Sequence, residues 1–256
     1  SFAEVLQAYG NVTMPDLPGF GGMDSFYKIG EKPDLDTMAD YLASVIKLRY
    51  KGRRFTLVGV SYGFIVVTRM LQRYPDIAKK VDVLLSVAGF AHQEDLLFSA
   101  NRRRMYKLGA YVFSTRPTAL LFRNIALHPS MLRAVYHRTH NAKHKFSGFN
   151  EDEKRAITEF EIVLWRKNDV RTHMTTSISM LTLNNCTYRV DVPVHHIGVE
   201  ADNYFNNDLV EQHMKVIFSE FTYHKAPLDR HVPSILAGKK ENAKLMPASI
   251  KRLLRK

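Results

Sequence analysis

The residues with the clearest capacity for chemistry form the pentapeptide Gly-Val-Ser-Tyr-Gly at positions 59–63. An apolar run at 55–58 precedes it, and a helix-like segment at 64–74 follows it directly. A serine on such a sharp strand-to-helix turn is held out from the backbone, and we expect both neighbouring glycines to be needed to avoid side-chain clashes. The N-terminus of the following helix would aim free N–H groups at an oxyanion beside the serine. Ser61 is therefore a candidate nucleophile.

A serine hydroxyl becomes a good nucleophile when a base takes its proton and a carboxylate orients that base. The chain supplies both groups downstream, in the order Ser61, Asp202, His231. Asp202 and His231 each follow an expected strand, at 192–198 and 220–224. The carboxyl ends of parallel strands share one edge of the sheet, so these three residues are expected to converge there.

Two rivals compete for these roles. Glu200 is an alternative acid close to Asp202, and His224 is an alternative base near the end of its own strand. We favour His231 because it lies in a loop and is followed by Val-Pro-Ser, whereas His224 is more typical of a histidine on a strand face. The paired histidines at 195–196 lie inside a strand, where packing or hydrogen bonding is the expected role.

The elements that must position these residues alternate along the chain. Strands are expected at 11–14, 55–58, 81–88, 192–198 and 220–224, and helices at 2–9, 35–49, 64–74, 207–218 and 232–237. Asp34 is a plausible N-cap for the helix at 35–49. Strands that alternate with helices predict a mostly parallel sheet with helices on both faces.

A long helical segment interrupts this alternation. Residues 92–187 are basic, aromatic and without a convincing strand. A segment of that length is too long for a plain loop. The predicted organisation is an α/β core made of residues 1–91 and 188–256, with a helical domain at 92–187 inserted in it.

Four segments, in this order, resemble the α/β-hydrolase superfamily: the Pro-Asp-Leu-Pro-Gly-Phe-Gly loop at 15–21, the pentapeptide at 59–63, the strand and turn at 194–202, and Arg-His-Val-Pro at 230–233. The resemblance implies a doubly wound α/β-hydrolase fold in which the helical insertion is a cap over the site. It also implies Ser61 as nucleophile, Asp202 as triad acid, His231 as general base and the backbone N–H of Tyr62 as oxyanion donor. Serine at the nucleophile position argues against the dehalogenase and epoxide-hydrolase branches, which carry aspartate there.

One expected part of the family pattern is missing from the sequence. Superfamily members carry an earlier strand and a His-Gly-type loop, which gives a second oxyanion N–H, ahead of the segment that residues 2–9 resemble. We expect this chain to lack those N-terminal strands and that loop, either as a fragment or with an unusual oxyanion hole. Loss of one oxyanion donor typically lowers kcat by about 10²–10³-fold.

Composition limits the classes of protein that fit. With 37 Lys and Arg against 25 Asp and Glu, the 256-residue chain carries a formal charge of +12, which favours anionic partners. A single cysteine, Cys186, excludes an intramolecular disulfide framework. No apolar run approaches the roughly 20 residues of a membrane-spanning helix, and no signal pattern is present, so we expect a cytoplasmic protein.

The sequence therefore predicts a serine hydrolase, of carboxylesterase or lipase type, that cleaves a carboxylic ester or related acyl bond through an acyl-enzyme. The alternative is a catalytically impaired hydrolase-fold protein that binds ligands or partners. No cofactor or metal is expected. The expected partner is a small-molecule ester or acyl substrate with an apolar group, with an anionic headgroup or membrane surface as a further possibility, because the helical insertion interleaves aromatic and basic residues. No motif for specific nucleic-acid recognition is present. We expect the basic tail at 239–256 to pack on the core.

Overall fold

The computed structural model describes the whole chain except residues 1, 139–148, 200–201, 229–230, 232–236 and 256. The chain forms two compact units. The first combines Ser1–Pro15, Asp34–Arg103 and Ser179–Lys256, and the second combines Asp16–Pro33 with Arg104–Ile178.

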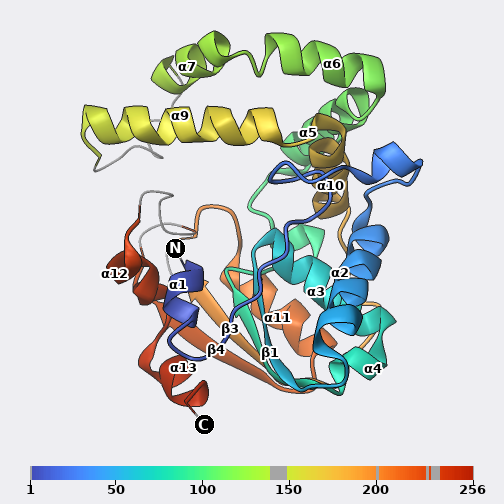
Figure 1. Cartoon of the computed structure of the whole chain (residues 1–256), viewed down its shortest axis with the longest axis vertical. Coiled ribbons are helices and arrows are strands. Elements are labelled where there is room, and N and C mark those ends of the chain that lie inside the picture. The colour runs from blue at the N-terminus through green and yellow to red at the C-terminus, as the bar shows by residue number, and fades with distance from the viewer. Residues whose placement is uncertain (1, 139–148, 200–201, 229–230, 232–236, 256) are drawn as a thin grey trace. The chain divides into compact units, whose positions relative to one another are not determined.

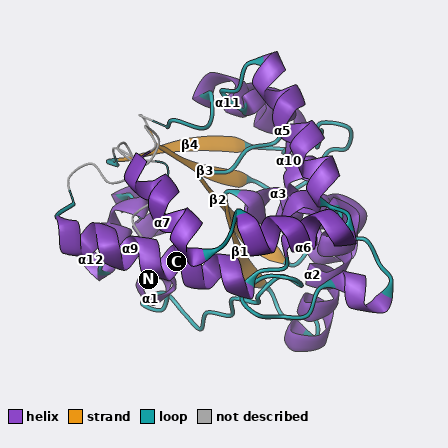
Figure 2. Ribbon diagram, turned by 90° about the horizontal axis from the view of Figure 1, so that it is seen from above, coloured by secondary structure: helices purple, strands orange, loops and turns teal. Residues whose placement is uncertain are grey.

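The first unit is built on a four-stranded sheet (Figures 1 and 2). Its strands are β1 (Phe55–Val60), β2 (Val81–Val87), β3 (Val194–Val199) and β4 (Phe221–Ala226). They lie in the order β1-β2-β3-β4, and every neighbouring pair is parallel. The predicted parallel sheet is confirmed, and all four strands end at the same edge of it.

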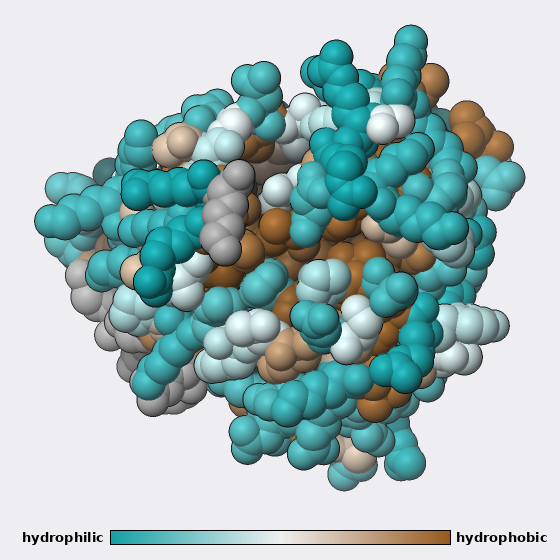
Figure 3. Space-filling model, turned by 90° about the horizontal axis from the view of Figure 1, so that it is seen from below, coloured by the Kyte–Doolittle hydropathy of each residue, from teal (hydrophilic) through white to brown (hydrophobic). Residues whose placement is uncertain are grey.

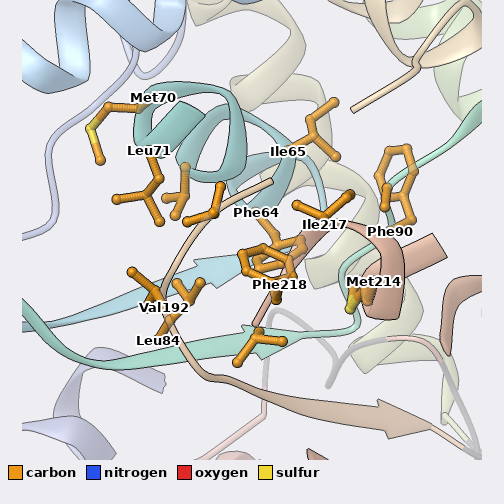
Figure 4. Close-up of a cluster of buried hydrophobic side chains, with 14 of the residues drawn as sticks. Phe64, Ile65, Met70, Leu71, Leu84, Phe90, Val192, Met214, Ile217 and Phe218 are labelled. Atoms are coloured by element: carbon orange, nitrogen blue, oxygen red, sulfur yellow. The ribbon is translucent and has the colours of Figure 1, made fainter. Parts of the chain in front are cut away.

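Alternate residues of the strands pack into two separate clusters, one on each face of the sheet. In β2, Leu84 belongs to the first cluster, whereas Leu85 and Val87 belong to the second. In the first cluster, Phe64 of α3 (Tyr62–Arg73) packs against Phe218, which follows α11 (Asn207–Ile217), with ring centroids 5.9 Å apart (Figure 4). Side chains that point to both faces need cover on both, which is the arrangement of a doubly wound sheet.

Helices supply that cover. The first cluster is closed by α2 (Leu35–Tyr50), α3, α4 (Pro75–Ala78) and α11. The second is closed by α1 (Phe2–Leu6), the short 3₁₀ turn η3 (Ala243–Leu245) and α13 (Ala248–Leu253), and α12 (Lys239–Asn242) contacts α1 and η3. Asp34 caps α2 as predicted, because its carboxylate accepts the N–H of Thr37 at 3.0 Å. The basic tail packs on the core as predicted, with Leu245 and Ile250 fully buried.

Two expected elements do not appear among the described residues. The strand predicted at 11–14 is wrong, since that segment is irregular and pairs with no strand among the described residues. A short apolar run becomes a strand only where a neighbour takes up its backbone hydrogen bonds. The helix expected at 232–237 falls almost entirely outside the described residues.

Within the described ranges, β1 lies at the edge of the sheet and pairs with β2 alone. Figure 3 shows the face of the molecule that lies at the bottom of Figure 1, where hydrophilic side chains surround a group of apolar ones near the middle. Some apolar surface therefore remains uncovered on this face.

Among the described residues, no helix is long and apolar enough to cross a membrane.

The second unit is helical. It contains most of α5 (Ala100–Phe113) and α10 (Val170–Leu181), with α6 (Arg116–Ile125), α7 (Pro129–Arg138) and α9 (Glu151–Lys167) between them. Its own small core joins Ala119, Leu127, Leu132, Ile162 and Val170. The loop at 16–33 belongs to this unit, because Ser25 and Tyr27 hydrogen-bond to Thr172 and Thr175 of α10. The sequence did not predict that the loop at 16–33 would belong to the helical unit. The cap boundaries predicted at 92 and 187 stay a prediction.

Candidate active site

Ser61 lies at the turn between β1 and α3, in a backbone conformation that side-chain-bearing residues rarely adopt. Its φ is 47° and its ψ is −115°. Strain of this kind costs roughly 1–3 kcal/mol and persists only where the surrounding structure enforces it. A strained serine at the C-terminal end of a strand and the N-terminus of a helix is the geometry of a nucleophile elbow.

The two glycines of the pentapeptide have different roles. A Cβ at Gly59 would lie 2.5 Å from the Cα of Phe64, so only glycine lets the strand and helix approach this closely. A Cβ at Gly63 would meet nothing within 4 Å. The expectation that both glycines avoid a clash is therefore right for Gly59 and wrong for Gly63, because position 63 is already inside α3 and faces open space.

The adjacent strands fix the serine from the other side. The N–H of Ser61 donates to the carbonyl of Val87 at 3.0 Å, and the N–H of Ala88 donates to the carbonyl of Ile197 at 2.9 Å. Backbone hydrogen bonds thus connect the end of β1 to β2 and the end of β2 to β3. The sheet therefore holds the backbone of Ser61 in a fixed position.

His231 connects the other two predicted site residues. Its Nδ1 lies 2.6 Å from Oδ2 of Asp202, and its Nε2 lies 3.2 Å from Oγ of Ser61. An ionised carboxylate can only accept a hydrogen bond, so Nδ1 carries the proton and Nε2 of the neutral ring offers a lone pair. Nε2 can therefore accept the hydroxyl proton of Ser61.

Backbone hydrogen bonds fix the side chain of Asp202, which in turn bonds to His231. Its side chain is 2% exposed, and its Oδ1 accepts the backbone N–H groups of Tyr204 and Phe205 at 2.8 Å and 3.2 Å. One carboxylate oxygen therefore binds the local turn, and the other binds the imidazole. An aspartate that accepts the N–H groups two and three residues later forms an Asx-type turn, a local signal readable in Asp-Asn-Tyr-Phe at 202–205.

Two aromatic rings flank the imidazole. The ring centroids of Tyr204 and Phe205 lie 5.1 Å and 5.0 Å from that of His231, and Phe205 stacks on Phe90 at 4.5 Å. The rings restrict the orientation of the imidazole while leaving Nε2 directed at Ser61. The sequence pattern gave no sign of these contacts.

The backbone N–H of Tyr62 lies directly after Ser61 at the start of α3. Its N–H is the first of α3 and has no hydrogen-bond partner among the described residues. Its side chain packs against the core, where the hydroxyl has no hydrogen-bond partner in the described part of the chain. Burial raises the pKa of Tyr62 above its ordinary value. The side chain is thus a poor proton donor, and the backbone N–H is the group available to an oxyanion.

The rival residues do not reach Ser61 in the described part of the chain. His224 bonds to His195 at 3.2 Å and to Ser249 at 2.8 Å, and burial lowers the pKa of His224. His196 is buried, bonds to Ser86 at 2.9 Å, and burial lowers its pKa to about 3. The strand histidines are packed and hydrogen-bonded, as predicted. Glu200 lies outside the described residues.

A second group of polar side chains could hold a metal ion. Among the described residues, His92, Glu94 and His213 each offer one ligand atom within 4.8 Å of the others. Two of these residues are separated from the third by more than a hundred positions, so ligand spacing in the sequence could not reveal the group. The predicted absence of a metal rested on histidines of the insertion instead, of which His128 bonds to Ser130. The side chains of His137, His140 and His144 lie outside the described residues.

Comparison with known proteins gives a likeness of structure alone. No protein-family model and no curated protein sequence matches the chain. Among solved structures, a thermophilic esterase from Thermogutta terrifontis superposes with a TM-score of 0.60 at 15% identity, covering 99% of this chain and 81% of that one. A variant of the N-acyl homoserine lactonase AidH in complex with N-hexanoyl homoserine gives 0.59 at 15%, covering 99% and 83%. An α/β-hydrolase family protein from Desulfitobacterium hafniense, described as putative in its name, gives 0.58 at 16%, covering 99% and 88%. With its parallel sheet and its strand–turn–helix at Ser61, the chain has the α/β-hydrolase fold.

Proposed function

We propose that the protein is a serine hydrolase that cleaves a carboxylic ester or a related acyl bond. The observation that carries the proposal is the hydrogen-bonded chain from Ser61 Oγ through His231 to Asp202, made by residues up to 170 positions apart. The order Ser, Asp, His is the chain order of triads in this fold. The structures of similar fold include a thermophilic esterase and an N-acyl homoserine lactonase.

The geometry supports a two-step reaction. Nε2 of His231 removes the hydroxyl proton as Oγ of Ser61 attacks the carbonyl carbon. The N–H of Tyr62 stabilises the oxyanion, and the imidazolium returns the proton to the leaving alcohol. Water, activated by the same imidazole, then releases the acid and restores the serine. Asp202 keeps Nδ1 protonated throughout and stabilises the charged ring.

Ester hydrolysis by single variants tests this proposal. Wild type should hydrolyse p-nitrophenyl esters, and Ser61→Ala should lower kcat by about 10⁴-fold or more. Ser44→Ala is the matched control, since Ser44 is an exposed helix serine that bonds only to the carbonyl of Asp40 within the described residues. Equal activity of Ser61→Ala and wild type would refute the proposal. An inactive but folded wild type would favour the rival function, a binding module of the same fold.

For the substrate, we propose an acyl group of apolar character. The helical unit exposes apolar side chains at helical spacing on α5 (Met105, Leu108, Val112) and further ones on α6 (Leu120, Leu121, Ile125). Exposed apolar patches of this kind mark surfaces that bind apolar partners, which is what supports an apolar substrate group. Across p-nitrophenyl esters from acetate to octanoate, kcat/KM should rise with acyl length. A fall with length would argue for a small polar substrate.

The same helices carry Arg104, Lys107, Arg116 and Arg123 beside the apolar residues. A basic helix with an exposed apolar stripe is suited to an anionic lipid surface. We therefore expect the protein to co-sediment with vesicles that contain anionic lipid and to remain in solution with uncharged ones. Equal behaviour with both kinds of vesicle would remove the membrane from the list of partners.

A further inference from the structure

A second cluster of side chains lies where the chain leaves β2. His92 and Glu94 belong to the short 3₁₀ turn η2 (Gln93–Asp95) and its N-cap, and His213 projects from α11. One ligand atom of each lies within 4.8 Å of the other two, and the two imidazole centroids are 4.6 Å apart. No hydrogen bond joins any of the three to Ser61 or His231 among the described residues.

A buried carboxylate orients one of these histidines. Oδ1 of Asp95 lies 2.5 Å from Nδ1 of His213, and the Asp95 side chain is completely buried. Its Oδ2 accepts the backbone N–H groups of Ala91 and His92 at 2.7 Å and 2.9 Å. The carboxylate can only accept, so Nδ1 of His213 carries the proton and Nε2 is the nitrogen with a lone pair. Metal-binding histidines almost always donate their other ring N–H to a carboxylate, a backbone carbonyl or water, and such a partner fixes the tautomer and raises ligand basicity.

The remaining ligand atoms are close to coordination distance. Nδ1 of His92 lies 3.7 Å from Oε2 of Glu94. The same nitrogen accepts the backbone N–H of Glu94 at 3.3 Å, a hydrogen bond that a metal ion on Nδ1 would replace. Ligand atoms of a tetrahedral zinc ion stand about 3.4 Å apart, given bonds of about 2.0–2.1 Å. The two imidazoles are mostly buried, with 14% and 20% of their side chains exposed, whereas the Glu94 side chain is 60% exposed. The flexible carboxylate can therefore close on an ion from the solvent side, where a water completes the coordination.

We propose that His92, Glu94 and His213 bind one divalent transition-metal ion, with Zn²⁺ as the best match. Two imidazole nitrogens and one carboxylate oxygen form a ligand set that zinc accepts. Asp95 is a positioning residue that holds His213 for the ion. The proposal does not depend on the proposed hydrolase activity.

A bound metal ion would connect η2 to α11, and η2 is hydrogen-bonded to the segment that follows Asp202. The carbonyl of Asp95 accepts the N–H of Asn206 at 2.8 Å, and the N–H of Leu97 donates to the carbonyl of Tyr204 at 2.9 Å. The turn that carries two of the ligands is thus tied to the segment that follows Asp202. The expected role of the ion is structural, as a clamp between η2 and α11, and its expected signature is a higher unfolding temperature.

Calorimetric titration of the full, chelator-treated chain with ZnCl₂ tests the proposal. Wild type should bind one Zn²⁺ per chain, and saturating Zn²⁺ should raise its unfolding temperature. Glu94→Gln should weaken binding by at least about tenfold and His213→Gln by about 100-fold, since even outer-shell changes cost 10–100-fold in affinity. Glu94 is exposed, so its variant remains informative if His213→Gln fails to fold.

Two matched controls separate this site from unspecific binding. Glu211→Gln removes a carboxylate of the same helix, α11, and His128→Gln removes a histidine of the helical unit. Both should bind Zn²⁺ as wild type does. The proposal is overturned if wild type takes up no stoichiometric Zn²⁺, or if Glu94→Gln and every folded histidine variant of the site keep wild-type affinity.

Discussion

Oδ2 of Asp202 and Nδ1 of His231 lie 2.6 Å apart, and the carboxylate is almost completely buried. The two residues come from separate loops, 29 positions apart in the chain. Because the other oxygen of Asp202 is committed to the N–H groups of its own turn, this contact fixes both the position and the tautomer of the imidazole.

Asp202→Asn should lower kcat by about 10⁴-fold with little change in KM, because an amide N–H facing Nδ1 favours the wrong tautomer. Steady-state kinetics on an ester that wild type hydrolyses measures the loss. The control is Asp208→Asn, an exposed aspartate in the first turn of α11, which should keep wild-type kcat. A folded Asp202→Asn protein within tenfold of wild type would show that Asp202 does not act on His231.

The ring of Tyr204, half exposed and 5.1 Å from the imidazole, should restrict the orientation of His231. An aromatic contact of this kind is worth about 0.5–1.5 kcal/mol, so Tyr204→Leu should lower kcat by roughly two- to tenfold. Tyr188→Leu changes a comparably exposed tyrosine elsewhere and should leave kcat unchanged. If Tyr204→Leu matched this control, the ring would have no part in positioning the base.

The local motifs carried most of what the sequence could predict. Ser61, Asp202 and His231 each follow a strand, and the common edge of a parallel sheet brings them together without knowledge of any side-chain contact. Helices and strands with strong periodicity were likewise predictable. Tyr204, Phe205 and Asp95 were not, because their roles depend on partners distant in the chain, such as the 118 positions between Asp95 and His213. The strand predicted at 11–14 was wrong for the same reason, because a strand forms only where another strand takes up its backbone hydrogen bonds.

Gly59 and Gly63 provide a matched pair for stability. Gly59→Ala places a Cβ 2.5 Å from the backbone of Phe64 and should reduce the free energy of unfolding by about 1–3 kcal/mol or more. Gly63→Ala meets open space inside a helix, so it should be neutral or stabilise by up to about 1 kcal/mol. Urea unfolding of both variants measures the difference. Equal effects would mean that strand and helix do not approach at Gly59.

His196 should make stability depend on pH in a defined direction. Its pKa is about 3 in the folded chain, against roughly 6.5 for an unperturbed histidine. Between these values the unfolded chain binds a proton at this position and the folded chain does not. Stability should therefore fall as pH is lowered through this window, by at most about 1.4 kcal/mol per pH unit from this residue, and should be unaffected above it.

His196→Asn removes this titration while keeping a polar partner for Ser86. Urea unfolding of wild type and variant at pH 5 and pH 7 isolates the contribution of His196, because the other buried histidines remain in both proteins. The variant should show the smaller loss between pH 7 and pH 5, whatever its stability at pH 7. An identical pH dependence would mean that His196 is not buried in its neutral form.

The most direct test of the central claim is covalent labelling of Ser61 by a fluorophosphonate, read by intact mass and by peptide mapping. The probe requires a serine whose hydroxyl is activated by a neighbouring base, so it reports the Ser61–His231 pair without assuming a substrate. The wild-type chain should gain one adduct on Ser61, Ser61→Ala should gain none, and His231→Ala should react far more slowly. A folded wild-type protein that gains no adduct, or an adduct that persists in Ser61→Ala, would contradict the assignment of Ser61 as nucleophile.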